Sequence, residues 1–116
     1  MNKLEYRIDS KIIKQLSLYL LLHGVRDFHL DFHSNSKDVT FILSVKKIKQ
    51  ETLDKMQEKL SRRREIEVEV YGWELLGDTD SQNELDILGS LIDHIEIIKH
   101  DDFTKIIMKR TYRYKE

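Results

Sequence analysis

Two alternating segments joined by a four-residue connection are the feature that most restricts how this chain can fold. In segments 25–33 and 39–45 apolar and polar side chains alternate from Phe28 onward, with Ile42 as an exception. Residues 34–37 between them read Ser-Asn-Ser-Lys. Alternation with a period of two is typical of a strand that buries one face. A connection this short joins antiparallel neighbours. We therefore expect an antiparallel hairpin whose apolar face is covered by other elements.

Apolar residues spaced three and four apart predict three helices to cover that face. The first follows a cap at Asp9 or Ser10 and ends at Gly24, where a left-handed terminator is needed. The second spans residues 50–62, and the third follows Ser81, which forms a capping-box pattern with Glu84. Further strands are expected at residues 4–8, 65–71, 93–99 and 104–112.

The resulting order is β-α-β-β-α-β-α-β-β, which predicts an α+β fold. We expect a two-layer sandwich, with a mixed or antiparallel sheet of about five strands and helices on one face. The 116 residues form a single domain, 1–116, by length. The predicted core comprises Ile12, Leu16, Leu20, Phe28, Leu30, Phe32, Phe41, Leu43, Leu53, Met56, Ile66, Val68, Leu85, Leu88, Ile92, Ile97, Ile106 and Met108.

Composition excludes several classes of function. The net charge of −1 creates no overall field that favours nucleic acid or an anionic membrane. The absence of cysteine excludes disulfides, thiolate metal sites and a cysteine nucleophile. The longest apolar run, residues 18–22, is too short to span a bilayer, and residues 1–11 lack the apolar stretch of a secretion signal. The expected location is the cytoplasm.

Parts of the chain resemble the GHKL family of ATPases, which includes histidine kinases and anti-sigma-factor kinases. NELDILGSLIDHIEI followed by DDFTKIIMKR resembles the C-terminal helix, strand, turn and strand of the anti-sigma-factor kinases. LSLYLLLHGVRDFHLDF resembles the family's N-box helix, its His-Gly end and the next strand. The resemblance implies the family's scaffold.

The residues that serve nucleotide in that family are replaced here. Where its first helix carries Glu and Asn, this chain has Gln15 and Tyr19. Where its second strand is followed by Asp-x-Gly, residues 45–48 read Val-Lys-Lys-Ile. Where its last helix opens with Gly-x-Gly, residues 82–84 read Gln-Asn-Glu, and an acid there repels phosphate. We therefore expect no ATP site, no cofactor and no catalysis.

A metal site is one alternative. In a strand at FHLDFH, the side chains of His29, Asp31 and His33 share one face, and neighbours on that face lie about 6.6 Å apart along the axis. Imidazole is a common zinc ligand, but a third ligand would have to come from another strand. Glu65, Glu67 and Glu69 could supply it only if their strand were a neighbour. We expect a solvated polar face.

Protein contacts are the expected function, with an unidentified protein or a second copy of this chain as partner. Trp73 forms an apolar cluster with Tyr71 and residues 75–76, which either closes the core or contacts a partner. Glu67 and Glu69 lie on an acidic strand face. Aromatic anchors are common at interfaces. A last strand at the sheet edge would also allow pairing with its own copy.

The alternative function is a nucleic-acid-binding module. It would use Arg62–Arg64 and the basic C-terminal tail, in which Tyr112 and Tyr114 alternate with Arg113 and Lys115. The acids near these residues are equally numerous, which argues against nucleic acid as the partner.

Overall fold

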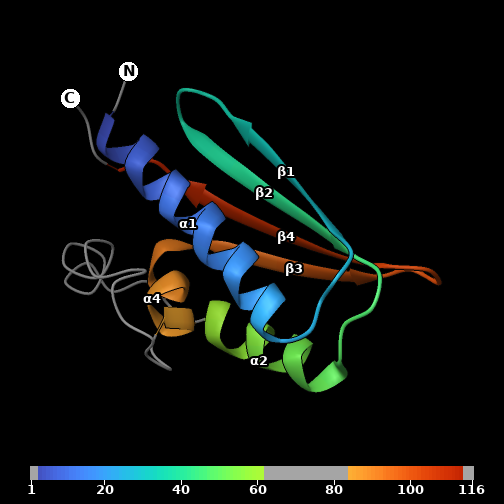
Figure 1. Ribbon diagram of the computed structural model, residues 1–116. Coiled ribbons are helices and arrows are strands. Elements are labelled where there is room, and N and C mark those ends of the chain that lie inside the picture. Colours follow the sequence, from blue (N-terminus) through green and yellow to red (C-terminus); the bar gives the residue numbers. More distant parts are fainter. Residues whose placement is uncertain (1–2, 62–83, 114–116) are drawn as a thin grey trace.

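The computed structural model describes residues 3–61 and 84–113, whose arrangement is shown in Figure 1. Its helices are α1 (Lys3–Leu22), α2 (Gln50–Leu60) and α4 (Glu84–Leu91), and its strands are β1 (Phe28–Ser34), β2 (Asp38–Val45), β3 (His94–Lys99) and β4 (Thr104–Thr111). The four strands form one antiparallel sheet in the order β1-β2-β4-β3. The predicted α+β class is therefore confirmed.

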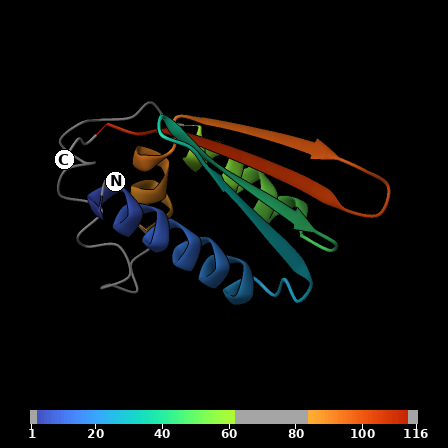
Figure 2. The same ribbon diagram turned by 90° about the horizontal axis from the view of Figure 1, so that it is seen from above.

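The helices pack together against one face of the sheet (Figures 1 and 2). Burial along β2 alternates residue by residue, so that every second side chain enters the core. The core joins this strand face to the inner faces of the helices through the side chains of Ile8, Ile12, Leu16, Leu20, Val39, Phe41, Leu43, Val45, Met56, Leu88, Ile106 and Met108. Full burial of one such side chain contributes about 1.5–3 kcal/mol to folding.

Local sequence signals set the end of α1 and the turn of the β1–β2 hairpin. The Asn35 side-chain oxygen accepts hydrogen bonds from the backbone N–H groups of Lys37 (2.7 Å) and Asp38 (2.8 Å), which closes the turn. Gly24 has a φ of 80°, a conformation that glycine adopts without strain. The Val25 N–H then bonds the Leu20 carbonyl at 2.9 Å, and this bond ends α1 as predicted.

The predicted first strand, residues 4–8, is wrong, because this segment is the beginning of α1. Leu4, Tyr6 and Ile8 do alternate, but Ile8 also lies four residues before Ile12 on the buried stripe of the helix. The helix continues to Lys3 because the buried Glu5 carboxylate forms an ion pair with Arg110 of β4.

The positions of Phe32 and of the last strand differ from the predictions, and one predicted strand lies outside the described residues. Phe32 is 42% exposed rather than buried, because it lies on β1 at the edge of the sheet. The last strand, β4, is an inner strand between β2 and β3, so the prediction that it forms an edge is wrong. The predicted strand at 65–71 and its core residues, Ile66 and Val68, lie outside the described residues.

A buried ion pair connects α1 to the sheet. The Arg110 Nη2 donates to Glu5 Oε1 at 2.8 Å, and both side chains are 0% exposed. The Arg110 Nη1 also donates to the Leu91 carbonyl at 3.0 Å, and the Arg113 N–H donates to Glu5 Oε2 at 2.6 Å. One arginine on β4 therefore holds both the start of α1 and the end of α4.

A glycine allows the two shorter helices to approach closely. A side-chain carbon at Gly89 of α4 would overlap the backbone carbonyl oxygen of Lys59 on α2. At the edge of this contact, the Lys59 ammonium lies 3.3 Å from an Asp86 carboxylate oxygen. Close packing of α2 on α4 completes the helical layer beside α1.

Removal of one partner from the buried ion pair should cost more stability than removal of both. Arg110→Met leaves the Glu5 carboxylate buried without its cation, and we expect the free energy of unfolding to fall by about 3–5 kcal/mol. In the double variant Glu5→Leu/Arg110→Met no buried charge of the pair is left, so the loss should be smaller than for Arg110→Met alone. Urea unfolding of the variants measures this difference.

Lys109→Met is the matched control, because Lys109 is exposed on the opposite face of β4. Its free energy of unfolding should stay within about 0.5 kcal/mol of the wild-type value. If the stability loss of the double variant equals the sum of the losses of Glu5→Leu and Arg110→Met, then Glu5 and Arg110 are not coupled.

Candidate functional site

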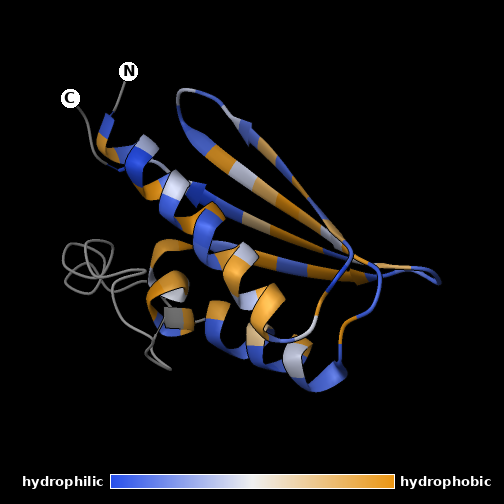
Figure 3. Ribbon diagram, viewed as in Figure 1, coloured by the Kyte–Doolittle hydropathy of each residue, from blue (hydrophilic) through white to orange (hydrophobic). Residues whose placement is uncertain are grey.

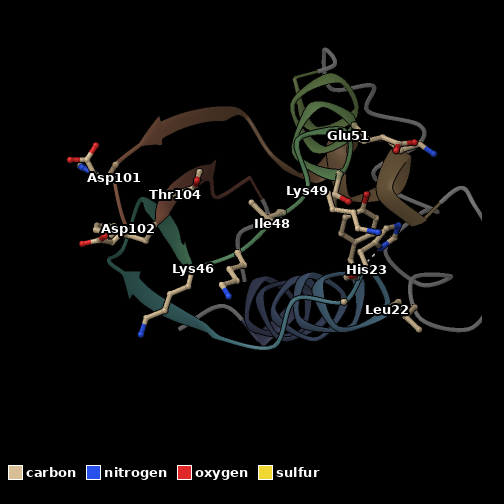
Figure 4. A pocket seen from close by; sticks show the side chains of 16 residues that line it. Leu22, His23, Lys46, Ile48, Lys49, Glu51, Asp101, Asp102 and Thr104 are labelled. Carbon is tan, nitrogen blue, oxygen red and sulfur yellow. Dashed lines mark hydrogen bonds between the residues drawn. The ribbon is translucent and has the colours of Figure 1, made fainter.

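A pocket of about 950 Å³ lies at the C-terminal end of α1 (Figure 4). Four segments form it: the end of α1, the loop after β2, the start of α2 and the turn between β3 and β4. At two of these segments the chain changes conformation at a single residue. Gly24 has a positive φ after α1, and Lys49 has an extended backbone immediately before α2. The pocket is thus built from element ends and loops, where binding sites are common.

Charge is distributed unevenly around this pocket. Its lysines are Lys46, Lys47, Lys49 and Lys55, and its acids are Glu51, Asp101 and Asp102. Figure 4 shows Asp101 and Asp102 on the β3–β4 turn, across the pocket from Lys49 and His23. The Lys46 ammonium also lies 3.4 Å from an Asp27 carboxylate oxygen. The side of the pocket next to α1 and α2 is therefore the more basic one.

Tyr19 and Gln15 occupy the positions at which the GHKL resemblance places Asn and Glu. The hydroxyl of Tyr19 and the side-chain nitrogen of Gln15 are buried, without a hydrogen-bond partner in the described part of the chain. Burial raises the pKa of the Tyr19 hydroxyl. The Tyr19 ring lies 4.1 Å from the ring of His23, whose Nδ1 is 2.9 Å from the Tyr19 carbonyl oxygen. Tyr19 lines the pocket and Gln15 does not.

Hydrophobic residues gather at the C-terminal end of α1, next to this pocket (Figure 3). Three of them, Leu18, Leu21 and Leu22, are exposed by 40%, 54% and 74%, and are here called the leucine stripe. Their spacing of three and four residues makes them neighbours on the helix surface. In the described residues no helix combines the length and the apolar character needed to cross a membrane.

The metal candidates His29, Asp31 and His33 are exposed together on the face of β1 away from the helices. Their cross-strand neighbours on β2 are Ser44, Ile42 and Thr40, none of which is a strong metal ligand. Within residues 3–61 and 84–113, no group of three histidine or acidic side chains could hold a metal ion. The acids of segment 65–69 lie outside those ranges.

The predicted partner-binding residues Tyr71, Trp73, Glu67 and Glu69 also lie outside the described residues, as does most of the candidate nucleic-acid surface, Arg62–Arg64 and residues 114–116. Two residues of the basic tail are described, and both contact the body of the protein. Tyr112 hydrogen-bonds to Asp9, and the Arg113 guanidinium lies 3.7 Å from an Asp93 carboxylate oxygen.

Sequence reasoning missed a second polar contact between α1 and the end of β4. The Tyr112 hydroxyl donates to Asp9 Oδ2 at 2.6 Å and lies 2.7 Å from the Ser34 hydroxyl. The other Asp9 oxygen is buried without a partner in the described part of the chain. Burial raises the pKa of the Asp9 carboxyl to about 6, although the Tyr112 hydrogen bond and the Arg110 charge lower it. Burial also raises the pKa of Tyr112.

Two signals in the sequence point to these buried charges. Glu5 and Asp9 are spaced four apart, one residue from the stripe that includes Ile8 and Ile12. On the last strand, Arg110 continues the alternation of Ile106 and Met108 on the buried face. Acids beside one apolar stripe and a cation within another predict a buried ion pair, since a buried charge needs a partner.

The raised pKa of Asp9 should make stability depend on pH. The carboxyl binds its proton more tightly in the folded protein, at about 6 against 3.8, so stability is lost as pH rises through this interval. Relative to Asp9→Asn, the wild type should lose about 2 kcal/mol of unfolding free energy between pH 4 and pH 7.

Urea unfolding at a series of pH values measures this difference. The control, Ser10→Ala, changes an exposed residue of the same helix and removes no titrating group, so its difference from the wild type should not vary with pH. A difference between the wild type and Asp9→Asn that is constant from pH 4 to pH 7 would refute the proposed cause.

Comparison with known proteins identifies no relative: no protein-family model, curated protein or solved structure matches this chain. The GHKL resemblance therefore stays a prediction, which rests on the residues quoted for it. The pocket and the leucine stripe beside it are the features that bear on function.

Proposed function

We propose that this chain is a non-catalytic protein-interaction module on a scaffold like that of the GHKL ATPases. The leucine stripe is the observation that carries the proposal, because Leu18, Leu21 and Leu22 expose apolar area on one helix face. Exposed apolar area that is contiguous often marks an interaction surface. A partner that covers these leucines would gain about 25 cal/mol for each Å² of apolar surface removed from water.

The pocket supports the scaffold part of the proposal. It joins the end of α1 to the loop after β2, and these are two of the places at which the family would bind a nucleotide. The side chains there differ from the family pattern. Tyr19 replaces an amide, and Lys46 and Lys47 precede Ile48 where an Asp and a Gly would be needed. These substitutions support a scaffold that neither binds nor hydrolyses a nucleotide.

Charge complementarity indicates the kind of partner. Leu22 belongs both to the leucine stripe and to the pocket, so the stripe continues directly into the basic side of the pocket. Lys14, which is exposed one turn before Leu18, extends the positive charge along α1. The partner that suits this surface is an amphipathic protein segment with apolar anchors flanked by acidic residues.

A fluorescent synthetic peptide with leucines at helical spacing and flanking glutamates should bind this surface. We expect the double variant Leu21→Glu/Leu22→Glu to weaken peptide binding at least about tenfold, because it removes apolar contact and repels the acids. Fluorescence anisotropy measures the dissociation constants.

Tyr6→Glu is the matched control, because Tyr6 is an exposed hydrophobic residue of the same helix, three turns away from the stripe. Its peptide affinity should equal that of the wild type. Equal binding of a peptide in which lysines replace the glutamates, or no binding of either peptide, would contradict the proposed partner chemistry.

The proposed lack of a nucleotide site has its own test. Addition of about 1 mM ATP with Mg²⁺ should leave the melting temperature unchanged, whereas a ligand at ten times its dissociation constant would add about 1.4 kcal/mol of stability. Differential scanning calorimetry measures the shift. A rise with Mg²⁺·ATP that GTP does not reproduce would overturn the non-catalytic part of the proposal.

A further inference from the structure

The sheet has two edges in the described residues, and β1 forms one of them. An edge strand presents backbone N–H and C=O groups that no neighbour satisfies, and proteins often protect such edges with lysine or proline. The sequence of β1, FHLDFHS, contains neither residue. Its inward-facing Phe32 is 42% exposed, although it lies 5.6 Å from the ring of Phe41.

The pairing of β1 with β2 determines which backbone groups point outward. The Lys46 N–H bonds the Asp27 carbonyl at 3.2 Å, and the Asn35 N–H bonds the Asp38 carbonyl at 3.0 Å. Both bonds continue the register of the hairpin, so the odd-numbered residues of β1 direct their backbone groups towards β2. The even-numbered residues, Phe28, Leu30 and Phe32, therefore direct theirs to the free edge.

An antiparallel copy of β1 can use these groups in only a few registers. If the two strands are centred on Leu30, Phe28 of each chain faces Phe32 of the other. On the opposite face, His29 then faces Asp31 of the second copy, and His33 faces Asp27. Aromatic residues thus meet on the core side, and imidazoles meet carboxylates on the open side, as favourable cross-strand pairs require.

The neighbouring registers with the same hydrogen-bond pattern are worse. A shift that centres the pair on Asp31 places the two Asp31 carboxylates opposite each other and sets His29 against His33. A shift in the other direction, centred on His29, places Asp31 opposite Asp27. Like charges directly opposite each other destabilise a strand pair. Of these three registers, only the one centred on Leu30 is free of such pairs.

We propose that β1 pairs with β1 of a second copy, antiparallel and centred on Leu30, so that two four-stranded sheets form one continuous sheet. The contact is two-fold symmetric and therefore closes as a dimer. A strand pair of this length buries on the order of 1,000 Å², the low end for stable interfaces, so the dimer should depend on concentration. It uses neither the leucine stripe nor the pocket.

Sedimentation equilibrium between about 5 and 500 µM tests this dimer. The wild type should approach twice its monomer mass of 14.0 kDa at high concentration. Leu30→Pro removes an outward N–H group and spares the bonds to β2, so this variant should stay monomeric with an unchanged circular dichroism spectrum. A wild type that stays monomeric, or a folded Leu30→Pro variant that dimerises, would overturn the proposal.

A charge exchange tests the register and does not depend on proline. Asp31→Lys alone places the new lysine opposite His29, and His29→Glu alone places the new glutamate opposite Asp31, so each variant should dimerise at least about tenfold more weakly than the wild type. In a mixture, the lysine of one chain faces the glutamate of the other, and heterodimers should form.

Two controls separate this edge from other surfaces. Glu96→Lys makes the same charge change as Asp31→Lys, on the same face at the opposite edge strand, and should dimerise like the wild type. Leu21→Glu/Leu22→Glu should also keep the dimer, even if it loses peptide binding. Loss of the dimer in either control, or absence of heterodimers in the mixture, would refute pairing through β1 in this register.

Discussion

The ion pair between Glu5 and Arg110 is the contact on which the arrangement of the layers depends. It joins two residues 105 positions apart and connects α1, β4 and the end of α4 at one buried point. Apolar contacts hold α1 against the sheet but specify its position only loosely, since many positions of an apolar stripe bury similar area. A fully buried guanidinium accepts few positions, because each of its N–H groups needs an acceptor. The pair thus contributes specificity of packing as well as energy.

The elements that could be predicted from the sequence are those whose signals are local. The hairpin of β1 and β2 follows from alternation and from the Asn35 turn, and the end of α1 follows from Gly24. At the start of α1 the local pattern favours a strand, because Leu4, Tyr6 and Ile8 alternate over a short window. Its helical state depends on Glu5 reaching Arg110, a partner that no local pattern of residues 3–10 contains.

The candidate site was less predictable than the fold, for a related reason. Its pocket is formed by ends and loops of four separate segments, and their meeting depends on the order of strands in the sheet. Tyr19 and Lys46 could each be singled out from the sequence, but their common pocket could not. Apolar residues on a helix are expected to be buried, whereas in the described residues Leu21 and Leu22 are exposed. The two surfaces, leucine stripe and β1 edge, would let one small domain contact two proteins at once.

The place of β4 between β2 and β3 has a consequence for biosynthesis. During translation the β1–β2 hairpin emerges well before β4, and the inner side of β2 stays unpaired until the ribosome has released β4. Contacts this distant in sequence form slowly. A nascent chain therefore exposes both sides of its first hairpin while synthesis continues. Until the sheet closes, both edges of the hairpin can pair with neighbouring chains.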